Sequence, residues 1–174
     1  MDRARTAFWA KTIATTLALC VGLWQPVVAE PAVQAAVFDF ELIDTSLEGE
    51  MAGKRADEQR RLKMISDELR RQLGESGRYL VVDKAPAADA IAQAGYLYGC
   101  NGCEADIARA LGAEVAIIGT VQKVSNLILN INIYLRDANS GEPLGGMSVD
   151  IRGNTDKSWS RGLSYLVRNR LLKK

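Results

Sequence analysis

The chain has 174 residues, of which 25% are charged, and its 22 lysine and arginine residues nearly balance its 21 aspartate and glutamate residues. This near-neutral mixture offers no basic surface for nucleic acid or anionic lipid, so we expect neither as a partner. The chain contains no histidine, which removes the commonest general base, the usual partner of a serine or cysteine nucleophile and the commonest metal ligand. Glycine-rich phosphate loops and GxSxG motifs are also absent from the sequence. We therefore expect a protein that is not an enzyme and that carries no cofactor or metal.

The N-terminal segment has the order of a cleavable secretory signal. Basic residues up to Lys11 precede an uncharged apolar run over residues 12–24, and Val27 and Ala29 occupy the small-residue positions before a cut at Glu30. The apolar run is shorter than the ~20 residues that a membrane-spanning helix needs, so a retained anchor is disfavoured. The sequence thus predicts an exported, periplasmic protein.

Lipidation at Cys20 is the alternative route of processing. Lipoprotein signals want a small residue immediately before the cysteine, and Leu19 occupies that position, so the sequence disfavours lipidation. Removal of residues 1–29 leaves residues 30–174, a length typical of one domain. No stretch of this remainder is long and apolar enough to span a membrane.

The first half of the mature chain predicts a parallel strand pair. Alternating apolar and polar residues over 36–43 indicate a half-buried strand, and the polar, glycine-containing residues 44–53 indicate a loop. Leucine and isoleucine at helical spacing predict a helix over 54–73, whose many charges we assign to a solvated face. A short apolar strand over 79–82 completes a βαβ unit.

The second half predicts a helix, three strands and a final helix. A helix is expected over 103–111, a buried central strand over 115–121 and a strand with strict alternation over 127–135. A turn leads to a strand around 147–151, and an amphipathic helix follows over 155–172. The fold class is therefore α/β: a single domain whose mixed sheet of about five strands is parallel in its first half and an antiparallel meander in its second. Three or four helices flank this sheet.

Two acidic side chains fall on one face of the first predicted strand. The alternation places Phe38 and Phe40 together on the apolar face and Asp39 and Glu41 on the opposite face. With Asp44 they suggest an acidic pair for hydrolysis or a cation site. The plainer interpretation is the polar side of a half-buried strand, because nothing else in the sequence converges there.

The motif Cys100-Asn101-Gly102-Cys103 is the sharpest chemical feature of the sequence. In an oxidising compartment, two cysteines this close favour a structural disulfide. Thiol–disulfide exchange is the functional alternative, because a helix that begins at Cys103 lowers a thiol pKa. The strand that leads directly into a thioredoxin CxxC is missing, as is a later proline for the opposing cis-proline loop. A zinc site needs two further ligands that the sequence does not supply.

The polar face of the predicted strand over 127–135 carries no charge. Its Asn130, Asn132 and Tyr134 look away from the leucine and isoleucine face. Uncharged amides and tyrosine are easier to desolvate than charges, so we expect this face to be covered. The cover is either the helix over 155–172 or the surface of another protein.

The sequence resembles an uncharacterised family of exported bacterial proteins. The resemblance rests on AVFDFELID, YLVVD and above all GCEADIARALGAEVAIIG, a CxGCE…LGA…G motif with its last glycine at Gly119. More distantly, the chain is similar to the N-terminal domain of TolB and to the periplasmic domain of CsgG. It has no room for the β-propeller of TolB and lacks the membrane-inserting hairpins of CsgG. These resemblances imply a mixed α/β domain that binds other envelope proteins and performs no catalysis.

Three hypotheses about function follow. The first is a non-enzymatic periplasmic module that binds or assembles envelope proteins, with a strand edge in its second half available to a partner. The second is a small periplasmic thiol oxidoreductase that uses Cys100 and Cys103. The third is a small-ligand binding protein whose loop Gly95–Gly102 borders an apolar pocket beside Tyr96 and Tyr98.

Overall fold

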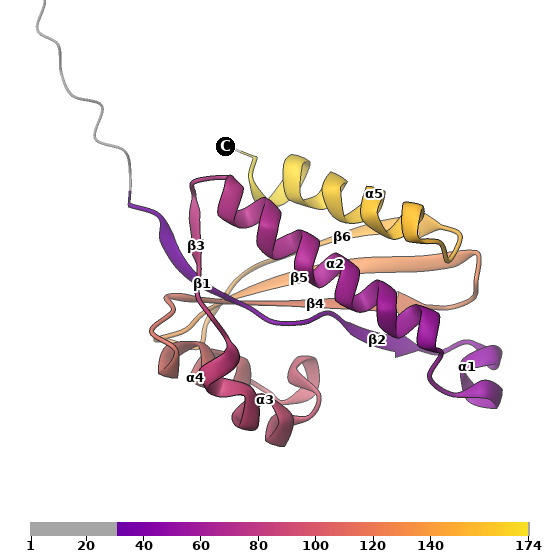
Figure 1. Cartoon of the computed structure of the whole chain (residues 1–174), viewed down its shortest axis with the longest axis horizontal. Helices are drawn as coiled ribbons and strands as arrows, with labels where there is room; N and C mark the ends of the chain where they lie inside the picture. Colours follow the sequence, from indigo (N-terminus) through magenta and orange to yellow (C-terminus); the bar gives the residue numbers. More distant parts are fainter. Residues whose placement is uncertain (1–30, 174) are drawn as a thin grey trace, which may run out of the picture. The chain divides into compact units, whose positions relative to one another are not determined.

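One mixed sheet organises the computed structural model, which describes residues 31–173 (Figure 1). Six strands form it within this part of the chain, in the order β3-β1-β4-β5-β6, with β2 beside β4. The pairs β1–β3, β1–β4 and β2–β4 are parallel, whereas β4, β5 and β6 form an antiparallel meander, which confirms the predicted fold class. The strands are β1 (Val33–Val37), β2 (Glu41–Asp44), β3 (Tyr79–Val81), β4 (Val115–Lys123), β5 (Ile128–Asp137) and β6 (Pro143–Arg152).

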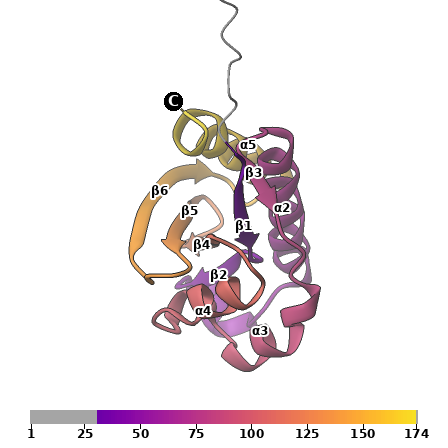
Figure 2. The same cartoon turned by 90° about the vertical axis from the view of Figure 1, so that its left-hand side faces the viewer.

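Helices cover both faces of the sheet. Helices α2 and α5 lie on one face, and α3 and α4 lie on the other (Figures 1 and 2). None of the helices in residues 31–173 has the length and apolar character required to cross a bilayer. The helices are α1 (Leu47–Ala52), α2 (Ala56–Glu75), α3 (Ala88–Ala94), α4 (Cys103–Ala110) and α5 (Asp156–Leu166), which η3 (Val167–Leu171) extends; two short turns are η1 (Ala85–Ala87) and η2 (Leu97–Gly99).

The two faces carry separate cores. The larger core joins the apolar stripe of α2, including Ile65 and Leu69, to Trp159 of α5 and to the β5 side chains Ile131 and Ile133. All five of these side chains are fully buried. The smaller core lies under α3 and α4 and is built from short alanine side chains around Phe38, Leu97, Ile107 and Ile118.

The predicted strand over 36–43 is interrupted by a β-bulge. Val37 pairs with Ile117, and Glu41 pairs with Thr120. The chain therefore advances four positions between these pairs while β4 advances three, which inserts one extra residue and separates β1 from β2.

The bulge moves the two phenylalanines to opposite faces of the sheet. Phe38 belongs to the smaller core and Phe40 to the larger one, so the prediction that they share a face is wrong. The extra residue inverts the alternation, and Phe40 then lies flat on the backbone of Gly119. A Cβ atom at Gly119 would come within 2.3 Å of the Phe40 ring.

The polar stretch over 44–53, expected as a loop, contains the short helix α1. The hydroxyl of Ser46 accepts a hydrogen bond from the Gly49 amide at 3.1 Å and caps the helix N-terminus. Gly53 ends the helix with φ of 68°, a conformation that suits glycine. None of the α1 residues is buried. A six-residue helix with one cap and no core contact leaves little periodic signal in the sequence.

A pair of glycines tests the packing of α5 on the sheet. A Cβ atom at Gly162 would lie 2.5 Å from Ile151 and 3.1 Å from Ile131, whereas one at Gly74 in α2 meets nothing within 4 Å. We expect Gly162→Ala to lower the free energy of unfolding by about 1–3 kcal/mol through overpacking. The matched Gly74→Ala should raise it by about 0.5–1 kcal/mol, as alanine ordinarily does in a helix. Urea denaturation of both variants measures the contrast, and an equal response would contradict the close packing of α5.

Candidate binding site and cysteine loop

The two cysteines lie at bonding distance. Their sulfur atoms are 1.94 Å apart, and Cys103 is the first residue of α4. The loop between them turns through Asn101 and Gly102, which both have positive φ, of 58° and 110°. The disulfide itself stays a prediction, to be checked in the protein.

A buried carboxylate lies beside this pair. Glu104 is 3% exposed, and its Oε2 atom lies 3.4 Å from the sulfur of Cys100. Its other oxygen accepts a hydrogen bond from Arg136 Nε at 2.6 Å. Cys100, Cys103 and Glu104 bring three ligand atoms within 4.8 Å of one another, one fewer than a structural zinc site uses. The arginine already neutralises the carboxylate, and the carboxylate repels a thiolate, so the arrangement suits neither a cation nor an attacking thiol.

The uncharged face of β5 lies opposite the helix over 155–172, which was one of its two predicted covers. Trp159 and Leu163 of α5 pack against the leucine and isoleucine face of β5, so this helix is not the cover, and that alternative is wrong. The reason is that α5 needs an apolar surface, which only this opposite face provides.

The three polar side chains of β5 have different surroundings. Asn130 donates a hydrogen bond to Asp150 at 2.8 Å, and Tyr134 packs against Tyr98 of η2 with ring centroids 5.2 Å apart. Asn132 is 8% exposed and donates to a buried threonine hydroxyl at 3.3 Å. The structure therefore covers the middle of this face within the chain, and a contact with another protein there remains a prediction.

The acidic residues near the first strand do not converge. Asp39 forms salt bridges with Arg70 and Lys84. Glu41 lies on the far side of the bulge and accepts hydrogen bonds from two backbone amides of η2, that of Leu97 at 2.7 Å among them. Burial raises the pKa of the Glu41 carboxyl, and the two amides act in the opposite direction. Each carboxylate thus holds a neighbouring element in place, and the two have no partner in common.

A buried lysine collects three carboxylates at one end of the sheet. The side chain of Lys123, the last residue of β4, has no exposed surface. Its Nζ atom contacts Glu58 at 2.7 Å, Asp44 at 3.1 Å and Glu48 at 3.2 Å. Burial alone would lower the pKa of Lys123, but hydrogen bonds to the three carboxylates outweigh it and leave the pKa raised. We call these four residues the ion network.

A second layer supports the ion network. The side-chain amide of Asn154 donates to Glu58 at 2.7 Å, and its oxygen accepts from Trp159 Nε1 at 3.0 Å and from Arg61 at 3.2 Å. The Oε2 atom of Glu58 has no hydrogen-bond partner among residues 31–173. The Oε1 atom of Glu58 is therefore bonded to Asn154 and Lys123, whereas its Oε2 atom is bonded to neither.

The ion network was not among the sites predicted from the sequence. The charged residues of the helix over 54–73 were all assigned to a solvated face, yet Glu58 is fully buried. One signal was available: Glu58 lies four positions before Leu62 and therefore continues the apolar stripe of α2. A second was Lys123, which is the one charged residue of β4.

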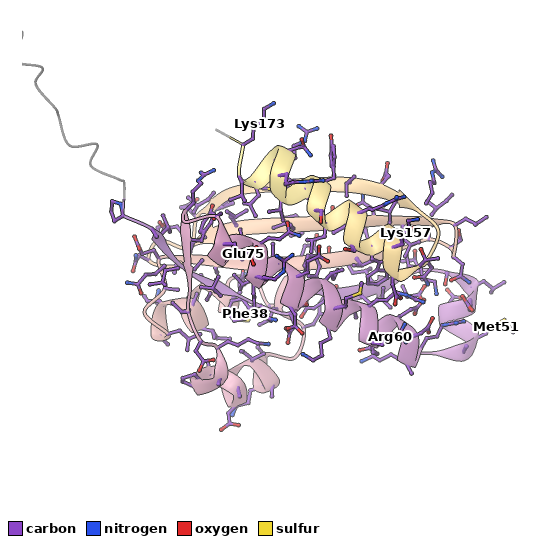
Figure 3. The ribbon with its side chains drawn as sticks, turned by 45° about the horizontal axis from the view of Figure 1, so that its top comes forward. Phe38, Met51, Arg60, Glu75, Lys157 and Lys173 are labelled. Carbon is purple, nitrogen blue, oxygen red and sulfur yellow. A yellow bond between two sulfur atoms is a disulfide. The ribbon has the colours of Figure 1, made fainter. Side chains whose placement is uncertain are left out.

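An exposed apolar surface covers the end of the domain beside the ion network. Leu47 and Met51 of α1 are 71% and 81% exposed, and Val124 and Leu127 of the β4–β5 turn are 59% and 73% exposed. A hydrogen bond of 2.7 Å from Asn126 to the α1 carboxylate Glu48 joins the two elements. Figure 3 shows Met51 at the outer end of α1, pointing away from the sheet. We call Leu47, Met51, Val124 and Leu127 the end surface.

The two tyrosines of the loop Gly95–Gly102 line separate cavities. One, of about 410 Å³, lies beside Tyr96 over the apolar side chains Phe40 and Leu62. The other, of about 180 Å³, lies beside Tyr98. Burial raises the pKa of Tyr96 to about 12, so its hydroxyl stays neutral. A single pocket shared by both tyrosines, as the sequence suggested, is not what the structure shows.

The ion network makes a quantitative prediction about stability. Lys123→Met leaves Glu58 buried without its cation, which should lower the free energy of unfolding by about 3–5 kcal/mol. The double variant Lys123→Met/Glu58→Leu removes both charges and should recover most of that loss. Lys63→Met is the control, because Lys63 forms an exposed salt bridge with Asp67 and should have little effect. Urea denaturation of the four proteins measures these effects, and the assignment would be refuted if the double variant were as unstable as Lys123→Met alone or less stable.

The cysteine pair makes a second prediction. The exported protein should show a mass two hydrogens lower without reductant, with Cys100 linked to Cys103. Because the linked loop is tiny, Cys100→Ser/Cys103→Ser should cost well under the ~3 kcal/mol of a 15-residue loop. A structural disulfide should have a reduction potential below about −300 mV. A potential near −200 mV would favour the oxidoreductase instead.

Solved structures resemble this chain in fold, at low sequence identity. The C-terminal domain of LpoB from Salmonella enterica superimposes with a TM-score of 0.51 at 16% identity, over 72% of this chain and 87% of that domain. At this identity the match shows a shared fold alone. No curated protein matches the sequence.

Two weaker matches carry no argument about fold or function. Lipoprotein GNA1162 from Neisseria meningitidis has a TM-score of 0.49 at 16% identity, over 80% of this chain and 97% of that one. TolB from Acinetobacter baumannii has a TM-score of 0.43 at 16% identity, over 80% of this chain and 28% of TolB. Cys20 lies outside the described part of the chain, so the expectation that it is not lipidated stays a prediction. The resemblance to CsgG stays a prediction.

A family model covers nearly all of the described residues. It matches residues 33–171, from the start of β1 to the end of η3. The chain therefore belongs to the DUF3280 family, whose description reads "Protein of unknown function (DUF2380)".

Proposed function

We propose that the mature chain is an exported protein of the bacterial envelope that binds another protein through its end surface and performs no catalysis. The observation that carries this proposal is the end surface itself. Four large apolar side chains are exposed on two elements that the Asn126–Glu48 hydrogen bond joins, on a chain in which 25% of residues are charged. Apolar side chains gathered in this way mark interaction sites on soluble domains.

Hydrogen bonds and salt bridges of Glu48 hold the end surface in position. Glu48 of α1 accepts from Lys123 and Asn126 and also pairs with Arg55. These bonds fix α1 against the β4–β5 turn before any partner arrives, which reduces the ordering cost of association. Complete burial of one leucine or methionine stabilises a complex by ~1.5–3 kcal/mol, so a few such side chains support a transient complex once association costs are subtracted.

The distribution of charged groups also supports binding over catalysis. In the ion network, the side chains of Lys123 and Glu58 are fully buried and therefore out of reach of a substrate. Glu41 and Asp39 are occupied by amides and cations of the chain itself. Groups placed in this way stabilise the fold, whereas a catalytic group needs an accessible reacting centre within hydrogen-bond reach.

A thiol oxidoreductase is the second candidate. One observation favours it, because Cys103 lies at the first position of α4, where the helix dipole stabilises a thiolate. Glu104 opposes it from 3.4 Å away. The reduction potential separates the two roles of the cysteine pair, as stated above.

The end surface is tested by site-specific photo-crosslinking in the envelope. A photoreactive residue at Met51 or Leu127 should give one discrete adduct, because both side chains would face the same partner. The matched controls are Leu80 on β3 and Tyr165 on α5, which are also exposed but lie outside the end surface. Equal adducts at all four positions, or none at Met51 and Leu127, would reject the end surface as the binding site.

Export is tested on the mature N-terminus. Processing by signal peptidase should yield a chain that begins at Glu30, and intact mass of the envelope fraction measures this. A chain that begins at an acylated Cys20 would identify a lipoprotein, and one that begins at Met1 would show that the signal is retained and would contradict the predicted cleavage.

A further inference from the structure

The outer edge of β2 has no strand beside it. Strand β3 pairs with β1 only over Val33–Ala35 and leaves the sheet before β2 begins. The amide of Thr45 donates to Lys123 at 2.9 Å, and in a parallel pair alternate residues point to alternate sides. Leu42 and Asp44 therefore direct their backbone N–H and C=O groups away from β4. These groups have no hydrogen-bond partner among residues 31–173.

A groove follows this edge. The cavity of about 410 Å³ beside Tyr96 adjoins a second cavity of about 340 Å³, and the two share Phe40, Gln59 and Leu62 as lining residues. The first reaches Gly53 at the end of α1, and the second extends over the bulge. We call the two together the β2 groove. Its wall spans six residues of the chain, from 39 to 44, which corresponds to ~20 Å of extended strand.

The charges that line the β2 groove are satisfied by the chain itself, with one exception. The exception is Lys54, which lies at the α1 end and forms no salt bridge among residues 31–173. The satisfied groups are Asp39 with Arg70 and Lys84, Lys63 with Asp67, Asp44 with Lys123, and Glu41 with two amides. The floor of the groove is apolar. An occupant therefore meets a free backbone edge, an apolar floor and one unpaired cation.

We propose that the β2 groove binds an extended peptide segment of a partner protein, which pairs with the backbone of Leu42 and Asp44 and directs an acidic side chain to Lys54. Alternate side chains of the segment lie on Phe40 and Leu62. This mode of recognition adds a strand to an open sheet edge, with affinity from main-chain hydrogen bonds and specificity from alternate side chains. The inference rests on the proposed protein-binding function and names the class of partner.

The test begins with selection of a peptide. Random heptapeptides displayed on phage are panned on the whole mature protein. We expect enriched sequences with apolar residues at alternate positions and an aspartate or glutamate at one fixed position. The most enriched peptide is then synthesised, and its binding is measured by fluorescence anisotropy.

Four variants locate the binding site. Gln59→Trp fills the groove from an exposed position on α2, and Lys54→Glu reverses its unpaired charge, so each should weaken binding at least tenfold. The matched controls are Gln93→Trp on α3 and Lys157→Glu on α5, which should stay within twofold of the native protein. Thermal melts confirm that all four variants fold. Replacing the acidic residue of the peptide by its amide should weaken binding to the native protein and not to Lys54→Glu.

Hydrogen exchange distinguishes strand addition from side-chain docking. The amides of Leu42 and Asp44 should become protected in the complex, whereas those of Glu41 and Ile43, which already face β4, should not change. The proposal is overturned if no peptide is enriched, if Gln59→Trp binds as the native protein does, or if the enriched peptides are basic. A dimer that sedimentation detects in the native protein and not in Gln59→Trp would assign the groove to a second copy of the chain and also overturn it.

Failure here is separable from failure of the proposed function. Crosslinks at Met51 and Leu127 with no enriched peptide would leave the end surface standing and remove only the groove. An enriched peptide that requires the β2 groove, found without crosslinks at Met51 and Leu127, would leave the groove standing and remove only the end surface.

Discussion

The contact between Lys123 and Glu58 is the interaction on which one end of the domain depends. Both side chains are fully buried, and a lone charge in such a place costs several kcal/mol, so each residue requires the other. Lys123 closes β4 and Glu58 lies in the first turn of α2, so the pair fixes where the helix starts relative to the sheet. Glu48 reaches the same ammonium group and thereby attaches α1. The position of the end surface is a consequence of this contact.

The bulge before β2 is caused by one extra residue, and it changes both the core and the edge of the sheet. One extra residue transfers Phe40 to the α2 side, where its ring covers Gly119 and forms part of the groove floor. The same residue changes which backbone groups face β4, so that Leu42 and Asp44 face outward. Because β3 stops short of this point, nothing in the described chain pairs with them. An open edge is normally a liability in a soluble protein, and its retention inside a lined groove suggests a use.

The sequence predicted what repeats along the chain and missed what depends on a single residue. The alternation over 127–135 and the apolar stripe of α5 recur at fixed periods, so both elements and the α/β class were predictable. The bulge leaves no such trace, because AVFDFELI alternates without a break and only the register against β4 reveals the extra residue. Glu58 is in phase with the apolar stripe, but which cation meets it is decided by the tertiary fold. The end surface was missed because α1 was expected to be a loop. The sequence left two covers open for the uncharged face of β5, and only the tertiary structure shows that α5 packs on the opposite, apolar face.

The end surface has little packing behind it, because α1 contributes no buried residue. Helix α1 has six residues and none is buried, so neither its length nor the core stabilises it. Helix α1 is ordered by the Ser46 cap and by the hydrogen bonds of Glu48. Because these bonds are directional, they set the position of α1 relative to the sheet more than they add to stability. In the proposed complex, a partner that covers Met51 and Leu127 supplies the apolar contact that α1 lacks. The bonds of Glu48 position α1 before the partner arrives, and the contacts that exist only in the complex then stabilise the ordered helix further.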